Sequence, residues 1–242
     1  MTSAVPVLSV VVPVRDERDS LVPLHRELDA ALASLGGPVE LIFVDDGSED
    51  GSLNVLRALE AKDPAVRVLP LGERRGQSAA LAEGFRAARA PLLATLDADL
   101  QNDPADIPRL LEHLGDADVV NGVRVGRLGR DSWARILVST LANAVRNRLT
   151  RETVTDVGCS LRVMRAEFVQ RIQLERGMHR FLPTLLRLEG ARLTEVPVAH
   201  RPRRYGVSKY GVFDRLWQSL GDLRTVRRMQ RAARRATPES LS

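Results

Sequence analysis

The sequence alternates short apolar runs with segments of helical periodicity, and this alternation limits the fold more than any other feature. Residues 8–14 form a β-branched run, a helical pattern covers about 21–35, and the same unit repeats at 39–44 and 52–62. Strands that are apolar on both faces are typical of a parallel sheet covered by helices on both sides. We therefore predict an α/β fold with a mostly parallel, Rossmann-like sheet flanked by helices.

The same pattern continues through the rest of the chain, where it becomes less regular. Further strands are predicted at 66–71, 92–96, 117–121, 160–164 and 193–198, and further helices at 77–90, 107–114, 133–149, 166–172 and 180–188. The G-x-G-x-x-G turn of dinucleotide-binding folds is absent from the sequence, so the chain lacks the phosphate-binding turn of that class.

Length and composition bound the organisation of the chain. With 242 residues, 44% of them hydrophobic, it can bury one substantial core. The sequence contains neither an uncharged apolar run of about 18 to 20 residues nor a signal-peptide pattern at its start. We therefore expect a protein that neither spans a membrane nor is secreted by that route. The single cysteine, Cys159, excludes an internal disulfide and is expected to be packed rather than catalytic.

The net charge is +5, and almost all of the positive charges are arginines, which are most frequent between 201 and 235. Residues 212–242 are predicted to form an amphipathic basic C-terminal helix and tail, separate from a main domain over 1–211. Its apolar residues recur at helical spacing: Phe213, Leu216, Trp217, Leu220, Leu223 and Val226.

Polar residues follow three of the predicted strands at their carboxyl ends, where open parallel sheets form a ligand crevice. Asp97, Asp99 and Gln101 follow the run at 92–96, and strand alternation is expected to send both carboxylates to the same side. Such oxygen ligands suit a hard divalent cation with a phosphorylated ligand. The carboxylates at 13–17 and 44–48 suit the hydrogen-bond donors of a nucleoside, although residues 45–48 also have the composition of a turn with a helix N-cap.

These motifs together resemble family 2 glycosyltransferases of the GT-A fold, in the branch of dolichyl-phosphate mannose synthases and bacterial polyprenyl-phosphate glycosyltransferases. The resemblance extends from residue 8 to about 211. It depends on the order of six motifs: PVRDE from 13, VDDGS from 44, DADLQ from 97, DVGCSLR from 156, HRFLP from 179 and RRYGVSKY from 203.

The resemblance implies roles for individual residues. Nucleotide-sugar binding would involve Pro13, Arg15, Glu17, Val44, Asp46, Asp97, Ala98, Asp99, Gln101, Arg203 and Lys209. A Mg²⁺ or Mn²⁺ ion would be held by Asp97, Asp99 and Gln101. The catalytic group would be Asp99, Arg124 and Arg135, with the two arginines meeting the acceptor phosphate. Arg203 and Lys209 would belong to a loop that closes over the donor phosphates.

The activity implied by the resemblance is metal-dependent, inverting transfer of a sugar from a UDP- or GDP-linked donor to a polyprenyl phosphate. A phosphate monoester is largely dianionic at neutral pH, so it needs no general base. Many bacterial relatives carry two transmembrane helices after the loop, where this sequence has the basic helix. We therefore expect a cytoplasmic protein, attached peripherally at the inner face of the membrane or through a membrane partner protein. The sequence leaves a homo-oligomer open.

Two alternatives remain at this stage. A family 2 transferase with a glycan or other hydroxyl acceptor would need a carboxylate base, for which Asp156 is the best candidate. A nucleic-acid-binding module would use the arginine-rich tail, but the basic residues there are not interleaved with aromatic ones. We therefore expect no nucleic-acid partner. His179 is expected to be structural rather than a general base.

Overall fold

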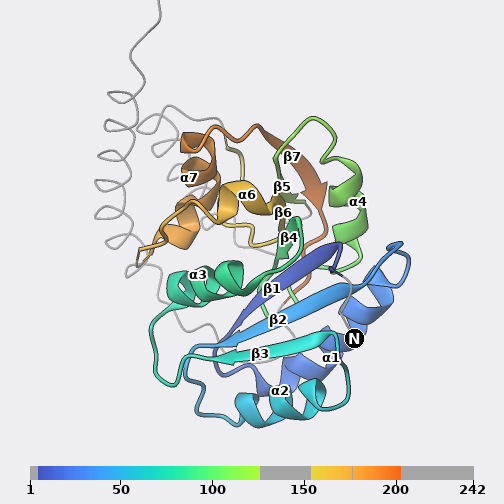
Figure 1. The fold of residues 1–242 in the computed structure, drawn as a ribbon, viewed down its shortest axis with the longest axis vertical. Coiled ribbons are helices and arrows are strands. Elements are labelled where there is room, and N and C mark those ends of the chain that lie inside the picture. The colour runs from blue at the N-terminus through green and yellow to red at the C-terminus, as the bar shows by residue number, and fades with distance from the viewer. Residues whose placement is uncertain (1–4, 126–153, 176, 203–242) are drawn as a thin grey trace, which may run out of the picture.

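The computed structural model describes residues 5–125, 154–175 and 177–202. Within these residues the strands form one sheet in the order β3-β2-β1-β4-β6-β5-β7 (Figure 1). Their bounds are β1 Leu8–Val14, β2 Val39–Asp45, β3 Val66–Pro70, β4 Leu92–Thr95, β5 Val119–Arg124, β6 Arg162–Arg165 and β7 Leu193–Val198. Strand β6 runs antiparallel to β4 and β5, and the other pairs are parallel. The predicted mostly parallel α/β fold is confirmed.

Helices cover both faces of this sheet, as Figure 1 shows. They are α1 Arg18–Leu32, α2 Ser52–Glu60, α3 Gln77–Ala87, α4 Asp106–Glu112, α6 Ala166–Val169 and α7 Leu182–Leu188, with a 3₁₀ turn, η1 Met178–Phe181, before α7. The helices predicted at 133–149 and 212–235 lie outside the described residues. No helix in the described part of the chain combines the length and apolar character needed to cross a membrane.

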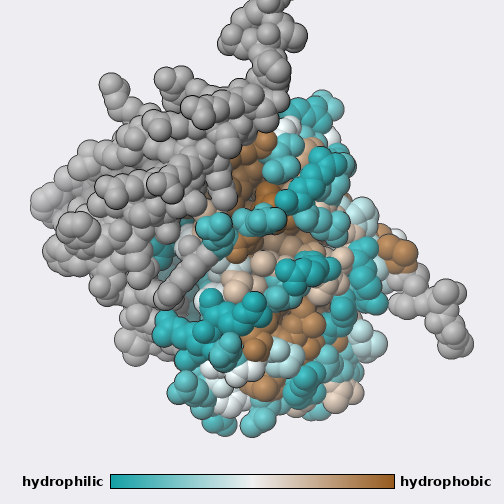
Figure 2. Space-filling model, turned by 60° about the vertical axis from the view of Figure 1, so that its left-hand side comes forward, coloured by the Kyte–Doolittle hydropathy of each residue, from teal (hydrophilic) through white to brown (hydrophobic). Residues whose placement is uncertain are grey.

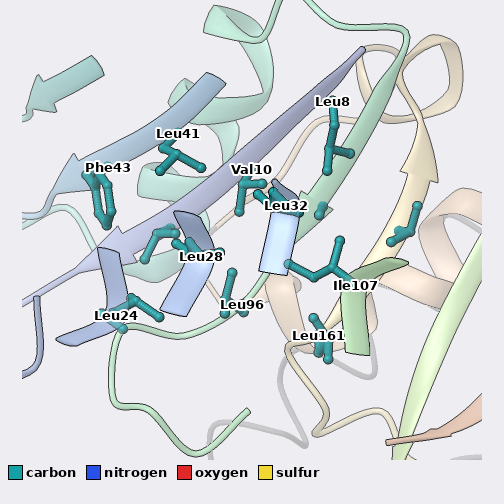
Figure 3. Close-up of a cluster of buried hydrophobic side chains, with 14 of the residues drawn as sticks. Leu8, Val10, Leu24, Leu28, Leu32, Leu41, Phe43, Leu96, Ile107 and Leu161 are labelled. Carbon is teal, nitrogen blue, oxygen red and sulfur yellow. The ribbon is translucent and has the colours of Figure 1, made fainter. Parts of the chain in front are cut away.

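Two apolar clusters hold the layers together. On one face, Leu24 and Leu28 of α1 and Ile107 of α4 pack against Val10 and Phe43 of the sheet (Figure 3). On the other face, the cluster is formed by α3, α6 and α7 with the opposite sides of the same strands. Because consecutive residues of a strand face opposite layers, the β-branched runs are buried on both sides.

Gly84 allows helix α3 to lie against the sheet. A Cβ atom at this position would lie 2.3 Å from Cγ1 of Val11, well inside van der Waals contact. The outer surface is mainly hydrophilic on the side drawn in Figure 2, with apolar patches between the hydrophilic residues. The close packing of α3 fixes its N-terminal residues at the edge of the sheet where polar side chains gather.

Candidate functional site

A cavity of about 610 Å³ opens at the carboxyl ends of β1, β2 and β4. The strand order reverses here, because β2 and β3 follow on one side of β1 and the chain then crosses to β4 on its other side. Open α/β sheets place their ligand sites at such a switch point. Most of the described residues that the sequence predicted for this site line the cavity: Pro13, Arg15, Glu17, Asp46, Asp97, Ala98, Asp99, Gln101 and Arg124. The structure thus brings together side chains that are more than a hundred positions apart.

The acidic pair lies beyond the end of the strand rather than on it. Strand β4 ends at Thr95, and Asp99 lies in the turn that follows. The Asp99 Oδ1 atom accepts a hydrogen bond from the Gln101 N–H at 3.1 Å, and Leu100 between them adopts a positive φ of 60°. Both carboxylates line the cavity as predicted, but strand alternation is not the reason, because both residues lie after the last residue of β4.

Burial in the cavity floor and the charge of Asp99 together raise the pKa of Asp97 to about 6. The Asp97 Oδ1 atom accepts a hydrogen bond of 2.8 Å from Nε2 of Gln77, the first residue of α3. Sequence reasoning missed Gln77, since nothing in its local pattern indicates contact with a carboxylate twenty positions away. Two carboxylates held side by side in a poorly solvated site form an oxygen donor set that suits a divalent cation.

The loop after β1 forms the opposite wall of the cavity. The Arg15 guanidinium donates to Oδ2 of Asp16 at 3.0 Å and to the backbone oxygen of Asp46 at 2.8 Å. The backbone N–H of Glu17 donates to Oγ of Ser52 at 3.0 Å, where α2 begins. These bonds attach the loop after β1, which forms one side of the predicted nucleoside pocket, to the loop after β2 and to the start of α2.

Asp46 organises the neighbouring loop through its carboxylate. Its Oδ1 accepts hydrogen bonds from the backbone N–H groups of Arg75 at 2.6 Å and of Gly76 at 2.8 Å. Val44 is the exception among the described predicted residues. Its side chain is fully buried in the cluster beneath α3 and does not reach the cavity wall.

Arg124, at the end of β5, is held by Asp156. The pair forms two side-chain hydrogen bonds, Nε to Oδ2 at 2.7 Å and Nη2 to Oδ1 at 2.8 Å, and the Arg124 N–H adds a third at 3.2 Å. The Asp156 carboxylate raises the pKa of Arg124 against the opposing effect of burial. A Cβ on Gly158 would lie 2.7 Å from Nη2 of Arg124, so the absence of a side chain there gives the guanidinium its place.

The strand β6 and the residues before it complete the cavity floor. Cys159 is fully buried, as predicted, and burial raises the pKa of its thiol to about 11. Arg162, for which the sequence predicted no role of its own, is 3% exposed and lines the cavity. Its Nε donates to Oδ1 of Asn121 at 2.7 Å and its Nη2 to the backbone oxygen of Val157 at 2.9 Å.

His179 connects η1 to the start of α3. Its Nδ1 lies 2.8 Å from Oγ of Ser78, and its own N–H donates to the same oxygen at 3.2 Å. Burial lowers the pKa of His179 to about 3, and the charges of Arg180 and Arg162 act in the same direction. A neutral imidazole fixed in this way has a structural role, although its ring also lines the cavity.

Three predicted site residues, Arg135, Arg203 and Lys209, lie outside the described residues. The described chain nevertheless ends beside the acidic loop. The N–H of Arg201 donates to the backbone oxygen of Gln101 at 2.8 Å, and Asn102 forms an isolated bridge with His200. The segment leading to Arg203 therefore starts next to the predicted metal ligands.

A cavity at this switch point that is lined by both paired carboxylates and arginines suits a phosphorylated ligand, as in the nucleotide-dependent transferases among α/β proteins. Comparison with known families identifies it further: residues 9–173 match the model of glycosyl transferase family 2. The chain belongs to this family.

Curated relatives with substantial identity act on polyprenyl phosphates, according to their names. The chain is 38% identical to the dodecaprenyl-phosphate galacturonate synthase of Rhizobium johnstonii over 225 residues, which cover 90% of this chain and 66% of the relative. It is 40% identical to the undecaprenyl-phosphate 4-deoxy-4-formamido-L-arabinose transferase of Edwardsiella ictaluri, over 85% of this chain and 63% of the relative. The chain thus spans slightly less than two thirds of the length of these relatives.

Solved structures confirm the GT-A fold. The glucosyl-3-phosphoglycerate synthase of Mycobacterium tuberculosis, in complex with Mn²⁺, UDP and phosphoglyceric acid, matches with a TM-score of 0.66 and 20% identity over 97% of this chain and 80% of that one. A mannosyltransferase from Pyrobaculum calidifontis, in complex with GDP-mannose and Mn²⁺, matches with a TM-score of 0.62 and 21% identity over 90% of this chain and 63% of that one.

Proposed function

We propose that this protein transfers a sugar from a UDP- or GDP-linked donor to a polyprenyl phosphate, with inversion at the anomeric carbon. The observation that carries the proposal is the pairing, in one cavity, of the Asp97 and Asp99 carboxylates with the guanidinium of Arg124. The two carboxylates suit a metal-bound diphosphate, and the guanidinium suits an acceptor phosphate. The names of the relatives support the lipid phosphate as acceptor.

The residues present fit a divalent metal ion. Asp97 and Asp99 supply hard oxygen ligands, and their mutual repulsion, which helps to raise the pKa of Asp97, is relieved by a cation. Gln101 lines the same wall and completes the predicted set. When bound, Mg²⁺ or Mn²⁺ would supply the positive charge that stabilises the departing nucleoside diphosphate. Structures of the same fold contain Mn²⁺.

The side chains of the site then have to bring two anions together. An acceptor phosphate monoester is largely dianionic at neutral pH and attacks without losing a proton. Arg124, oriented by Asp156, offsets its charge and holds it in line with the anomeric carbon. One displacement inverts that carbon, so an α-linked donor yields a β-linked lipid phosphate sugar.

The geometry disfavours a hydroxyl acceptor activated by Asp156. A general base must have a free oxygen directed at the proton it removes, whereas both Asp156 oxygens accept hydrogen bonds from Arg124. Asp156 is therefore best interpreted as the partner that orients Arg124. Transfer of label to free sugars with none to lipid phosphate would reverse this choice.

A lipid-linked acceptor implies contact with a membrane surface, direct or through a partner protein, at the cytoplasmic face where nucleotide sugars are available. The basic residues between 212 and 235 are suited to anionic lipid, because each contributes about 1 kcal/mol near such a surface. Three further statements remain predictions: a separate tail over 212–242, a homo-oligomer, and the absence of nucleic-acid binding. Vesicle flotation of the full chain and of a chain ending at 211 tests the tail.

The direct test of the activity uses a panel of UDP- and GDP-sugars, each radiolabelled in the sugar, with a polyprenyl phosphate and Mn²⁺ in detergent. We expect one donor to give label that partitions into organic solvent, and EDTA to abolish it. No lipid label from any donor, with a nucleoside diphosphate still bound in the presence of Mn²⁺, would favour a different acceptor or the need for a membrane partner protein.

A further inference from the structure

Arg162 differs from the other arginines that line the cavity. It is 3% exposed, whereas Arg15, Arg124 and Arg180 are only partly buried and Arg74 is exposed. Removing a guanidinium from water is costly unless a charged partner compensates for it. Its burial at the floor of a ligand cavity therefore needs a compensating interaction.

The partners of Arg162 within the described residues are both neutral. They are Oδ1 of Asn121 at 2.7 Å and the backbone oxygen of Val157 at 2.9 Å. Neither Asp97 nor Asp156 forms an ion pair with it: Oδ1 of Asp97 accepts from Gln77, and both oxygens of Asp156 are bound by Arg124. Two of its five N–H groups thus donate to neutral acceptors that hold the guanidinium in place. In the described part of the chain, no carboxylate forms an ion pair with it.

The position of Arg162 in the sheet places this charge between the strand that leads to Asp97 and the strand that ends at Arg124. Arg162 is the register partner of Thr95 on β4, the strand that leads to Asp97. On its other side it is the partner of Asn121 on β5, the strand that ends at Arg124. The positive charge of Arg162 acts to lower the pKa values of both Asp97, which follows β4, and His179 in η1, so its influence extends to residues from two separate elements.

We propose that Arg162 is a phosphate-binding residue of this cavity, held rigidly by Asn121 and Val157 so that its remaining N–H groups donate to a phosphate oxygen. This inference rests on the proposed function and deepens it. A planar guanidinium suits phosphate oxygens because it offers paired donors in a fixed geometry. The phosphate belongs either to the diphosphate of the donor or to the monophosphate of the acceptor, since both must approach this point.

The test compares Arg162→Gln, Arg162→Lys and the control Arg165→Gln. Arg165 lies on the same strand but pairs with Asp118 and does not line the cavity. Binding is measured by calorimetry with UDP or GDP plus Mn²⁺ and, separately, with farnesyl phosphate below its micellar concentration. We expect Arg162→Gln to weaken one of these ligands at least tenfold, Arg162→Lys to weaken it less, and Arg165→Gln to bind as the parent protein does.

The two ligands distinguish the sources of the phosphate. A loss confined to the nucleoside diphosphates assigns Arg162 to the donor, and a loss confined to farnesyl phosphate assigns it to the acceptor. If Arg162→Gln does not fold, Arg162→Lys decides, because it keeps the buried charge and loses the paired donors. Unchanged affinity for both ligands in a folded variant overturns the inference. Because binding is read without turnover, failure of lipid transfer in the parent protein is a separate result.

Discussion

Arg124 and Asp156 form a two-pronged ion pair across 32 positions of sequence, with Nε–Oδ2 and Nη2–Oδ1 distances of 2.7 and 2.8 Å. Both side chains are largely buried, at 18% and 11% exposure. Asp156→Asn leaves the guanidinium without its counter-ion, so we expect the free energy of unfolding to fall by about 1–3 kcal/mol. Urea denaturation of the purified variant measures this loss.

The same variant separates the two roles considered for Asp156. If it orients Arg124, the KM for the lipid phosphate rises more than that for the nucleotide sugar, and turnover survives at saturating acceptor. If it were a general base, turnover itself would collapse and the acidic limb of the pH profile would disappear. Glu83→Gln, at a partly exposed carboxylate that pairs with Arg86 and Arg75, is the control and should cost at most about 1 kcal/mol.

Asp99→Ala is expected to abolish transfer while leaving the fold intact. If Asp97 and Asp99 hold the metal ion as proposed, removal of one carboxylate lowers the affinity for Mn²⁺ and removes charge that organises the diphosphate, so kcat/KM should fall at least about 100-fold. Electron paramagnetic resonance of Mn²⁺ with UDP present reports the binding loss, and circular dichroism reports the fold. Near-normal turnover in the variant would contradict a metal-ligating role for Asp99.

His179 predicts how stability depends on pH. Its pKa is about 3 in the folded protein against 6.5 for an ordinary histidine, because the ring is buried beside Arg180. Below pH 6.5 the unfolded chain binds a proton that the folded protein does not, so the free energy of unfolding falls with acidity. Between pH 7.5 and 5.0 this histidine alone accounts for about 1–2 kcal/mol, after allowance for screening by the open cavity.

Comparison with His179→Gln isolates this contribution, since glutamine can still bond to Oγ of Ser78. The variant should lose less stability than the parent protein between the two pH values. Parallel losses in both proteins would show that His179 is protonated in the folded state. Urea unfolding at pH 7.5 and 5.0 supplies the comparison.

The sequence predicted the sheet well because the signal for a buried parallel strand is local. The strands at 8–14 and 193–198 have the predicted bounds, and most others agree within two or three residues. The grouping of Arg15, Asp46 and Asp99 also followed from sequence, since the carboxyl ends of parallel strands meet at one edge. Here local pattern and topology point to the same arrangement.

The remaining contacts could not be predicted because they depend on tertiary packing. Gln77 reaches Asp97 only because Gly84 allows α3 to approach the sheet. The turn that presents Asp99 requires a positive φ at Leu100, a conformation that leucine rarely favours. Arg162 closes the DVGCSLR motif, but nothing in that motif indicates that its side chain is buried, and only its register between β4 and β5 shows this.

The reactivity of the Cys159 thiol reports how rigid the cavity floor is. The thiol is fully buried, and burial raises its pKa to about 11, so at pH 8 it is almost entirely protonated and shielded from reagents. We therefore expect no reaction with a disulfide reagent such as DTNB in the native protein and one equivalent on unfolding in urea. Since the other residue types do not react, the time course reports Cys159 alone. Rapid labelling without denaturant would show that the floor beneath Arg124 and Arg162 opens readily, and the fixed donors inferred there would have to be abandoned.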